Sequence, residues 1–592
     1  MKKRKLETEE RSAVVKCGLK TSVTNPIFIH IIERYILNIS KRIHRAGLLL
    51  NHYVLKTLES NTPPEESVCS QIGDQMLYYA ALTLGSRSKY PDLISFFRDN
   101  QNKYESIEDL SGYGSSLNSA ARSMKTNMNN YLFMTFDQRI LKSLKDLDKS
   151  EKNAVLRRIK CFDCRKSYVF REQEQTFIDT CKSILGAGDM IITDKWIMEH
   201  PFQVLKLFRF LIQRCESSET KGFTILPIFH LKRHFITIDA VFLRTIMLEM
   251  GLIQKTCDVK TFRALKEDHF RSVFKLRNTW KIGGEMKTDG IALCVNVIRR
   301  KNDEYEDDDN TNKKKTSTKV QYNRKPGDEN NYFSNDPGNV NLASVIQVHN
   351  GEIVDKVGFT KWQYKHESNI NINTKKRRKL DKFVEEELSQ LSQCCTKTSS
   401  SSTFETYLTT KVPMYDKLWV HYGDKKFARM SFDTYIRSSS SLDGFFLKLS
   451  KTKKFDIDNK CDKPLMKFGK ATWDPGKGWT SGPTKKMIFH ARKFFRVVLV
   501  DEYNTTKMCC TCQCKMEPVK QKFIGPLRQG RHRWNMKCRG LMRCRSNVCL
   551  SVPLKARDYN AAINIGKAWP FRPTYLCRPL DMLSIQHTSV VV

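Results

Sequence analysis

Seven cysteines lie close together near the end of the chain, between Cys509 and Cys549. Two residues separate Cys509 from Cys512, and four separate Cys544 from Cys549. Four thiolates at such spacings suit a tetrahedral Zn²⁺ ion in a closed site, which stabilises a small ribbon and does no catalysis itself. We therefore predict a structural zinc ion on these four cysteines, in competition with other candidate ligands nearby: Cys510, Cys514, Cys538 and His532.

Three acidic residues stand at the ends of predicted elements in the last third of the chain. Asp336 opens an Asp-Pro-Gly sequence, Glu502 follows an apolar run, and Asp558 begins a short helical segment that ends at Gly566. Each has a structural explanation, because Asp suits a turn, a carboxylate after a strand is ordinarily a solvated loop residue, and Asp and Gly suit helix caps. By that explanation Asp558 is the N-cap and Gly566 the C-cap of the helix.

Together, the three carboxylates indicate a metal site if their elements are neighbours in one sheet. Converging carboxylates repel one another unless cations lie between them, and Mg²⁺ prefers oxygen ligands. Two such ions about 3.5 to 4 Å apart can activate water and stabilise the leaving oxygen in phosphodiester hydrolysis. We therefore predict that Asp336, Glu502 and Asp558 are the catalytic residues of a nuclease and bind two Mg²⁺ ions.

The elements that must position these carboxylates follow an α/β pattern. Apolar runs predict strands at 342–348, 353–359 and 494–500. Helical patterns at 379–393 and 404–419 lie between them.

The preceding part of the chain divides by its residue pattern. Apolar side chains recur at three- and four-residue spacings after residue 26, which is typical of helices, whereas Ile236-Thr237-Ile238 and the Asp289-Gly290 turn signal are typical of strands and hairpins. A stretch around Asp307 has many charges and few apolar residues. The predicted segments are a basic tail (1–25), a mainly helical lobe (26–220), a β-rich module (221–298) and a charged linker (299–330).

The charge of the chain narrows its partners. The 592 residues include 102 Lys and Arg against 63 Asp and Glu, a formal net charge of +39. This excess favours nucleic acid as the partner, because phosphates release counterions when they meet such a surface; the alternative is a basic but idle surface. With no apolar run of about 20 residues and no signal peptide, we expect neither a membrane nor a secreted protein, and the cysteines to be reduced thiols.

Two short basic clusters, at 2–5 and 375–379, are candidate nuclear import signals, so we expect a nuclear protein. A solvated terminus explains the first cluster equally well, and a helix facing phosphates explains the second.

The last third of the chain resembles the RuvC-like nuclease and inserted zinc ribbon of TnpB and, more closely, Fanzor, the eukaryotic and viral relatives of TnpB. The residues that carry this resemblance are Val500-Asp501-Glu502-Tyr503-Asn504-Thr505-Thr506-Lys507, Cys509-x-x-Cys512, Cys544, Cys549 and Arg557-Asp558-x-Asn560-Ala561-Ala562-x-Asn564-Ile565. It extends back through Phe468-Gly469, Asp336-Pro337-Gly338, Thr288-Asp289-Gly290, Ile236-Thr237-Ile238-Asp239 and Leu226-Pro227, and so spans most of residues 220–567. Thr506 stands where the family usually has Ser.

The resemblance implies a multidomain α/β protein whose RNase H-like (RuvC) nuclease comprises residues 331–505 and 554–592, with a zinc ribbon at 506–553. A helical recognition lobe and a β-rich wedge module would precede it. The implied activity is RNA-guided, Mg²⁺-dependent cleavage of double-stranded target DNA by a transposon-associated endonuclease that binds a guide RNA and works as a monomer. Asp336 is preferred to Asp474, which also opens an Asp-Pro-Gly sequence, because two predicted strands follow Asp336.

Two alternatives remain open from the sequence. An unguided nuclease of the same fold, structure-specific or linked to transposition, would have the same carboxylates. The second alternative is a nucleic-acid-binding protein with an inactive site, because the loss of one carboxylate is enough to abolish two-metal catalysis.

Overall fold

The computed structural model places most of the chain. The residues it describes are 11–60, 71–85, 88–110, 112–144, 146–161, 169–186, 188, 190–277, 280–299, 327–451, 463–470, 482–522, 535–570 and 572–577. The predicted linker at 299–330, His532 and the second Asp-Pro-Gly sequence at 474–476 lie wholly or mostly outside these ranges.

The described residues group into two compact units. Unit 1 comprises those within 1–303 and 377–432, and unit 2 those within 304–376 and 433–592. The predicted domains are successive segments of the chain, whereas unit 1 also takes in a segment from within the predicted nuclease. Helices α14 (Ile370–Asp381) and α18 (Lys425–Ser450) each run from one unit into the other.

Unit 1 is mainly helical, as predicted, and holds one small sheet. Its strands are β1 (Arg11–Gly18), β2 (Ile236–Asp239), β3 (Lys281–Thr288) and β4 (Ala292–Arg299). Its helices are α1 (Leu19–Ser22), α2 (Pro26–Glu59), α3 (Gln75–Thr83), α4 (Pro91–Asp99), α5 (Gly114–Ser143), α6 (Lys149–Lys160), α7 (Glu172–Leu185), α8 (Asp194–Glu199), α9 (Pro201–Ser217), α10 (Ala240–Glu249), α11 (Val259–Ala264), α12 (Lys266–Val273), α15 (Glu385–Gln393), α16 (Ser401–Lys411) and α17 (Tyr415–Tyr422).

The sheet of unit 1 corrects the prediction of a loose N-terminal tail. Strand β1 pairs antiparallel with β4 in the order β1-β4-β3-β2. Ala13, Val15 and Cys17 alternate toward the core, while Val14 between them is 64 % exposed. This period of two is the strand signal that the surrounding charges obscured. The β3–β4 hairpin is confirmed, with Gly290 at a φ of +87° in its turn.

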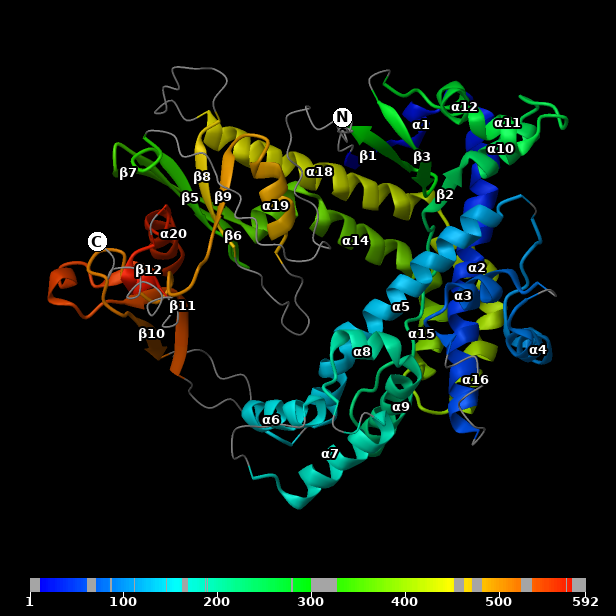
Figure 1. Cartoon of the computed structure of the whole chain (residues 1–592), viewed down its shortest axis with the longest axis horizontal. Coiled ribbons are helices and arrows are strands. Elements are labelled where there is room, and N and C mark those ends of the chain that lie inside the picture. The colour runs from blue at the N-terminus through cyan, green and yellow to red at the C-terminus, as the bar shows by residue number, and fades with distance from the viewer. Residues whose placement is uncertain are drawn as a thin grey trace, which may run out of the picture. The chain divides into compact units, whose positions relative to one another are not determined.

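Unit 2 is built around a five-stranded mixed sheet in the order β7-β6-β5-β8-β9 (Figure 1). The predicted strands after Asp336 are confirmed as β6 and β7, and the run before Glu502 as β9. The elements of unit 2 are β5 (Tyr332–Asp336), β6 (Asn341–His349), β7 (Glu352–Thr360), α13 (Lys361–Glu367), β8 (Leu465–Gly469), α19 (Thr484–Ala491), β9 (Arg496–Val500), β10 (Glu517–Lys522), β11 (Asn535–Arg543), β12 (Leu554–Ala556) and α20 (Arg557–Lys567).

The five-stranded sheet is covered on both faces. Strand β5 is antiparallel to β6 and parallel to β8, and β8 is parallel to β9. On one face Ala562 and Ile565 of α20 pack against Tyr332 and other apolar side chains of the sheet. On the other face α18 and α19 pack against Phe333, Met466 and their neighbours. The sheet is therefore fixed by two separate apolar layers, one on each side.

The segment between Glu502 and Asp558 folds as a small three-stranded antiparallel sheet, in the order β10-β11-β12. Its buried core consists mainly of cysteines. In the described ranges, no helix is long and apolar enough to cross a membrane.

Candidate functional site

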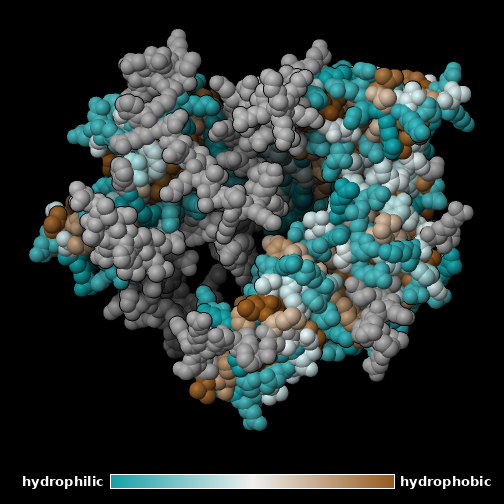
Figure 2. Space-filling model, in the orientation of Figure 1, coloured by the Kyte–Doolittle hydropathy of each residue, from teal (hydrophilic) through white to brown (hydrophobic). Residues whose placement is uncertain are grey.

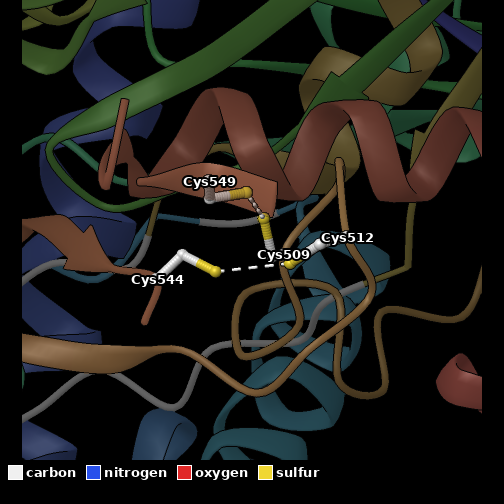
Figure 3. A group of neighbouring side chains, drawn as sticks. All are labelled: Cys509, Cys512, Cys544 and Cys549. Atoms are coloured by element: carbon white, nitrogen blue, oxygen red, sulfur yellow. Dashed lines mark hydrogen bonds between the residues drawn. The ribbon is translucent and has the colours of Figure 1, made fainter. Parts of the chain in front are cut away.

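The four predicted zinc ligands gather at one point of this small sheet, with their sulfurs facing one another (Figure 3). The Cys509 and Cys549 sulfurs are 3.8 Å apart, and those of Cys512 and Cys544 are 3.3 Å apart. All four sulfurs lie within 4.8 Å of one another. Because a zinc–sulfur bond of about 2.3 Å sets the edge of a tetrahedron near 3.8 Å, the cluster has the size that one zinc ion requires.

The cluster also settles which cysteines could hold the ion. Cys514 is exposed, and Cys510 and Cys538 are half-buried and stand outside the group. Burial opposes ionisation of Cys512, but hydrogen bonds from the Cys514 backbone N–H and the Cys544 thiol lower its pKa to about 6. The Cys549 pKa is instead raised, chiefly by burial. A bound zinc ion would supply the positive charge that allows all four thiols to ionise.

Two buried asparagines of α20 fasten the cysteine-rich segment to the sheet. The side-chain amides of Asn560 and Asn564 both donate to the carbonyls of Thr505 and Met508, at 2.8 to 3.2 Å. Asn560 also accepts from the backbone N–H of Cys510 at 2.9 Å. Since the Thr505 hydroxyl donates to the carbonyl of Glu502 at 2.9 Å, the thiol cluster and Glu502 share one support.

The first two carboxylates lie at the same edge of the five-stranded sheet. Asp336 is the last residue of β5, and Glu502 follows the end of β9 by two residues. Between them runs β8, parallel to both, and it ends at Gly469. Because the ends of neighbouring parallel strands meet at one edge, the topology brings these two carboxylates to the same edge of the sheet.

Gly469 is the residue that permits this approach. A Cβ atom placed on it would lie 2.0 Å from a carboxylate oxygen of Glu502 and 2.8 Å from Pro337. Any side chain at this position would therefore displace Glu502 or the turn that follows Asp336. The Phe468-Gly469 pair was part of the family resemblance, but its physical role is visible only when β8 lies between β5 and β9.

Asp336 is buried, with 6 % of its surface exposed. Burial raises its pKa well above the ordinary value, and the negative charges of Glu502 and Asp558 raise it further, against the opposing effect of Arg557. Asp336 is therefore close enough to both Glu502 and Asp558 to be repelled by each of them. A cation among them would reverse this effect, because it favours the ionised carboxylates.

Asp558 reaches the same edge from α20. Its carboxylate accepts a hydrogen bond at 2.9 Å from the side-chain amide of Asn341, the first residue of β6. The prediction that Asp558 caps this helix is wrong, because the N-cap is Ala556 and Asp558 lies in the first turn. Gly566 lies within the helix and Ala568 is the C-cap.

The carboxylates are more widely spaced than the thiols. Within the described part of the chain, only the four cysteines form a group of three or more ligand-type side chains whose ligand atoms all lie within 4.8 Å. Asp336, Glu502 and Asp558 thus share a sheet edge and interact electrostatically, but they do not form a closed cluster like the thiols.

Besides Asn341, sequence reasoning missed the positioning side chain of Lys467 in β8. It is 1 % exposed, and its ammonium donates to the carbonyls of Gly566 and Trp569 at 2.8 and 3.1 Å. It also lies 3.4 Å from the centre of the Tyr332 ring, and burial lowers its pKa to about 8. Lys467 therefore ties the C-terminal end of α20 to the sheet. A lysine within an apolar strand pattern was the only available signal.

No protein-family model matches the chain, and no curated protein matches it either.

Proposed function

We propose that the protein is a DNA endonuclease of the RNA-guided type, in which Asp336, Glu502 and Asp558 bind Mg²⁺ and hydrolyse phosphodiester bonds. The observation that carries the proposal is that Asp336 and Glu502 lie at one edge of the five-stranded sheet, where Asp558 is hydrogen-bonded to Asn341. Burial and, in addition, the charges of Glu502 and Asp558 raise the pKa of Asp336 there. An antiparallel hairpin after the first carboxylate, followed by two parallel strands, supports the RNase H-like assignment.

The residues at this edge have distinct roles in the proposal. Asn341 orients Asp558, and Gly469 leaves room for Glu502 beside the turn that follows Asp336. When bound, two Mg²⁺ ions would activate water and stabilise the charge on the leaving oxygen. The thiol cluster takes no part in the chemistry, because a closed four-sulfur site leaves no open position for substrate.

Nucleic acid as the substrate is supported by charge. The chain carries a net charge of +39, and the face drawn in Figure 2 is mainly hydrophilic wherever residues are described. The proposal of a guide RNA rests on the family resemblance, together with a large helical unit that offers many basic side chains. In guided systems base pairing reads the sequence and the protein supplies a positive channel, which matches this division of the chain.

The test is to express the chain with the DNA that flanks its gene, purify it and sequence the RNA that stays bound. We expect one defined RNA with a variable end. The loaded protein should then cut a plasmid that carries the complement of that variable end in the presence of Mg²⁺, and leave a plasmid with the scrambled sequence intact. Cleavage of both plasmids would indicate an unguided nuclease instead. Cleavage of neither plasmid would indicate an inactive nucleic-acid-binding protein.

A further inference from the structure

Helix α13 is held directly beside the carboxylate edge. It begins where β7 ends, and Thr360, its N-cap, lies opposite Asn341 in the sheet. The backbone N–H of Lys361 donates to the carbonyl of Val340 at 2.8 Å, and its ammonium donates to the Asn339 side chain at 2.9 Å. Both acceptors belong to the turn between Asp336 and Asn341. The start of α13 is therefore fixed to the same turn that leaves the catalytic edge.

Trp362 on this helix is a large apolar side chain that is not packed into a hydrophobic core. It is 72 % exposed, whereas Tyr364 of the same helix packs edge-on against the buried Phe359. The ring of His366 stacks on Trp362 with centroids 5.6 Å apart and planes within 16° of parallel. His366 thus covers one side of the indole and orients it, while the remaining surface stays open. An ordered, exposed indole is suited to stacking on a flat partner.

The surroundings of Trp362 are cationic. Lys361 and Lys365 flank it, and partial burial and the charge of Lys365 both lower the pKa of Lys361. Glu367, the acidic residue of the helix, receives hydrogen bonds from Gln363 and Ser441. Within the described residues, Lys365 forms no ion pair with an acidic side chain. An aromatic platform between two lysines complements a base attached to phosphates. It fits a protein partner poorly, because lysine is depleted at protein interfaces.

We propose that Trp362, with Lys361 and Lys365, is a stacking subsite for one base of the DNA strand that approaches Asp336, Glu502 and Asp558. This inference rests on the proposed function, and it specifies that the strand is locally single-stranded there. In a duplex both faces of a base are already stacked on their neighbours, so only an unstacked base can lie on the indole. The lysines hold the adjoining phosphates, and the indole contributes without regard to sequence.

The first experiment detects the contact without needing cleavage. Full-length protein is irradiated with a short DNA strand that carries 5-iodouracil, and the crosslinked peptides are identified by mass spectrometry. We expect a crosslink at Trp362 that survives in Trp362→Phe and is lost in Trp362→Ala. Phe489→Ala is the matched control, since Phe489 is another exposed aromatic residue of unit 2, on α19. The same strand annealed to its complement should not crosslink.

The second experiment measures single-strand cleavage kinetics. Trp362→Ala should raise KM about tenfold with kcat unchanged, which corresponds to the loss of one stacked base. The penalty should vanish on a strand with an abasic site at the crosslinked position, because charge is kept and the base is absent. Lys365→Ala should instead reduce the salt dependence of KM, since it removes a phosphate contact.

The outcomes separate this inference from the proposed function. A crosslink at Trp362 without DNA cleavage by the wild type would support the stacking subsite and contradict the proposed nuclease function. Cleavage that is unchanged in Trp362→Ala, without a crosslink, would overturn the subsite and leave the nuclease. A Trp362→Ala penalty that persists on the abasic strand would also overturn it, because the indole would then act in some way other than base stacking.

Discussion

The thiol cluster and the carboxylate edge are both candidate metal centres, but they are built in opposite ways. The four cysteines come from one short segment, and their sulfurs all lie within 4.8 Å of one another. The carboxylates come from three separate elements of the sheet and helix α20, and Asp336 is held where the charges of the other two disfavour its ionisation. The four thiols thus form a closed site for one structural ion. The carboxylates would form an open site for the proposed catalytic ions, in which their charges repel one another when no cation is bound.

The two centres are nevertheless joined. Asn560 and Asn564 hold the turn that leads from Glu502 into the cysteine cluster, and they belong to the helix that carries Asp558. Through these shared hydrogen bonds, we expect the cysteine cluster to support the position of Glu502. Damage to either site, or to the asparagines that link them, would show whether the other site responds.

The largest effect on stability is expected from loss of the thiol site. Cys544→Ser should reduce the zinc content from about one ion per chain to near zero, because a closed site needs all four ligands. Without the ion the ribbon loses its core, so the melting temperature should fall and DNA cleavage should drop at least tenfold through the displaced support of Glu502. Zinc is measured by mass spectrometry of the intact protein. Cys514→Ser, an exposed cysteine outside the cluster, should behave as wild type.

Gly469→Ala tests the carboxylate edge with the thiol site left intact. The added methyl group would overlap Glu502 and push it from the edge, and a displacement of about 1 Å costs on the order of 100-fold in rate. Zinc content should not change. Gly444→Ala in α18 is the control, because its new Cβ meets nothing within 4 Å. Equal cleavage rates in the two variants would mean that Glu502 need not occupy this position.

Asn564→Ala addresses the link itself. It removes the two hydrogen bonds that a fully buried amide donates and the one at 3.4 Å that it accepts from the Tyr575 hydroxyl, which should cost about 2 kcal/mol of unfolding free energy. Zinc should still bind, whereas cleavage should fall. Denaturant unfolding and zinc analysis on the same sample separate the two effects. If zinc is lost together with cleavage, the asparagine supports the ribbon rather than the connection.

Asp336→Asn has the smallest expected effect on stability, and the size of that effect depends on pH. The folded-state pKa of Asp336 is raised, so the folded protein binds this proton more tightly than the unfolded chain does. Stability in metal-free buffer therefore falls as the pH rises from the ordinary value of 3.8 through the folded-state pKa. The variant lacks this loss, so it should be more stable than the wild type at neutral pH and no more stable than it below pH 3.8. Asp501→Asn, at an exposed neighbouring carboxylate, should show no such gain.

The sequence predicted the parts of unit 2 that have strong local signals. Strands β6, β7 and β9 are apolar runs, and the four zinc ligands are close in the chain. Strand β8 escaped prediction, and β5 was expected only as the element that ends at Asp336, because each carries polar side chains that are buried against α20. The Ser334 hydroxyl donates to the carbonyl of Ala562, and Lys467 donates to carbonyls at the end of the helix. These hydrogen bonds have partners far away in the sequence, so a short stretch of sequence does not predict them.

The candidate site shows the same limit. Asp336, Glu502 and Asp558 were identified from their places at predicted element ends, and the topology explains how two of them meet. Asn341 and Gly469 acquire their roles only from contacts with residues far along the chain. The sequence also did not predict that residues 377–432 belong to unit 1. The predicted domains were successive segments of the chain, whereas this assignment rests on contacts with residues hundreds of positions earlier.

The central claim is that the three carboxylates form the hydrolytic centre. The most direct measurement compares Glu502→Gln with the wild type, both loaded with the RNA that copurifies, for binding and for Mg²⁺-dependent cleavage of the matching DNA. We predict an unchanged Kd and a cleavage rate at least about 1000-fold lower, since a disabled metal site forfeits roughly 4 kcal/mol of transition-state stabilisation. Cleavage by Glu502→Gln at the wild-type rate, with the fold and the bound RNA intact, would contradict the account.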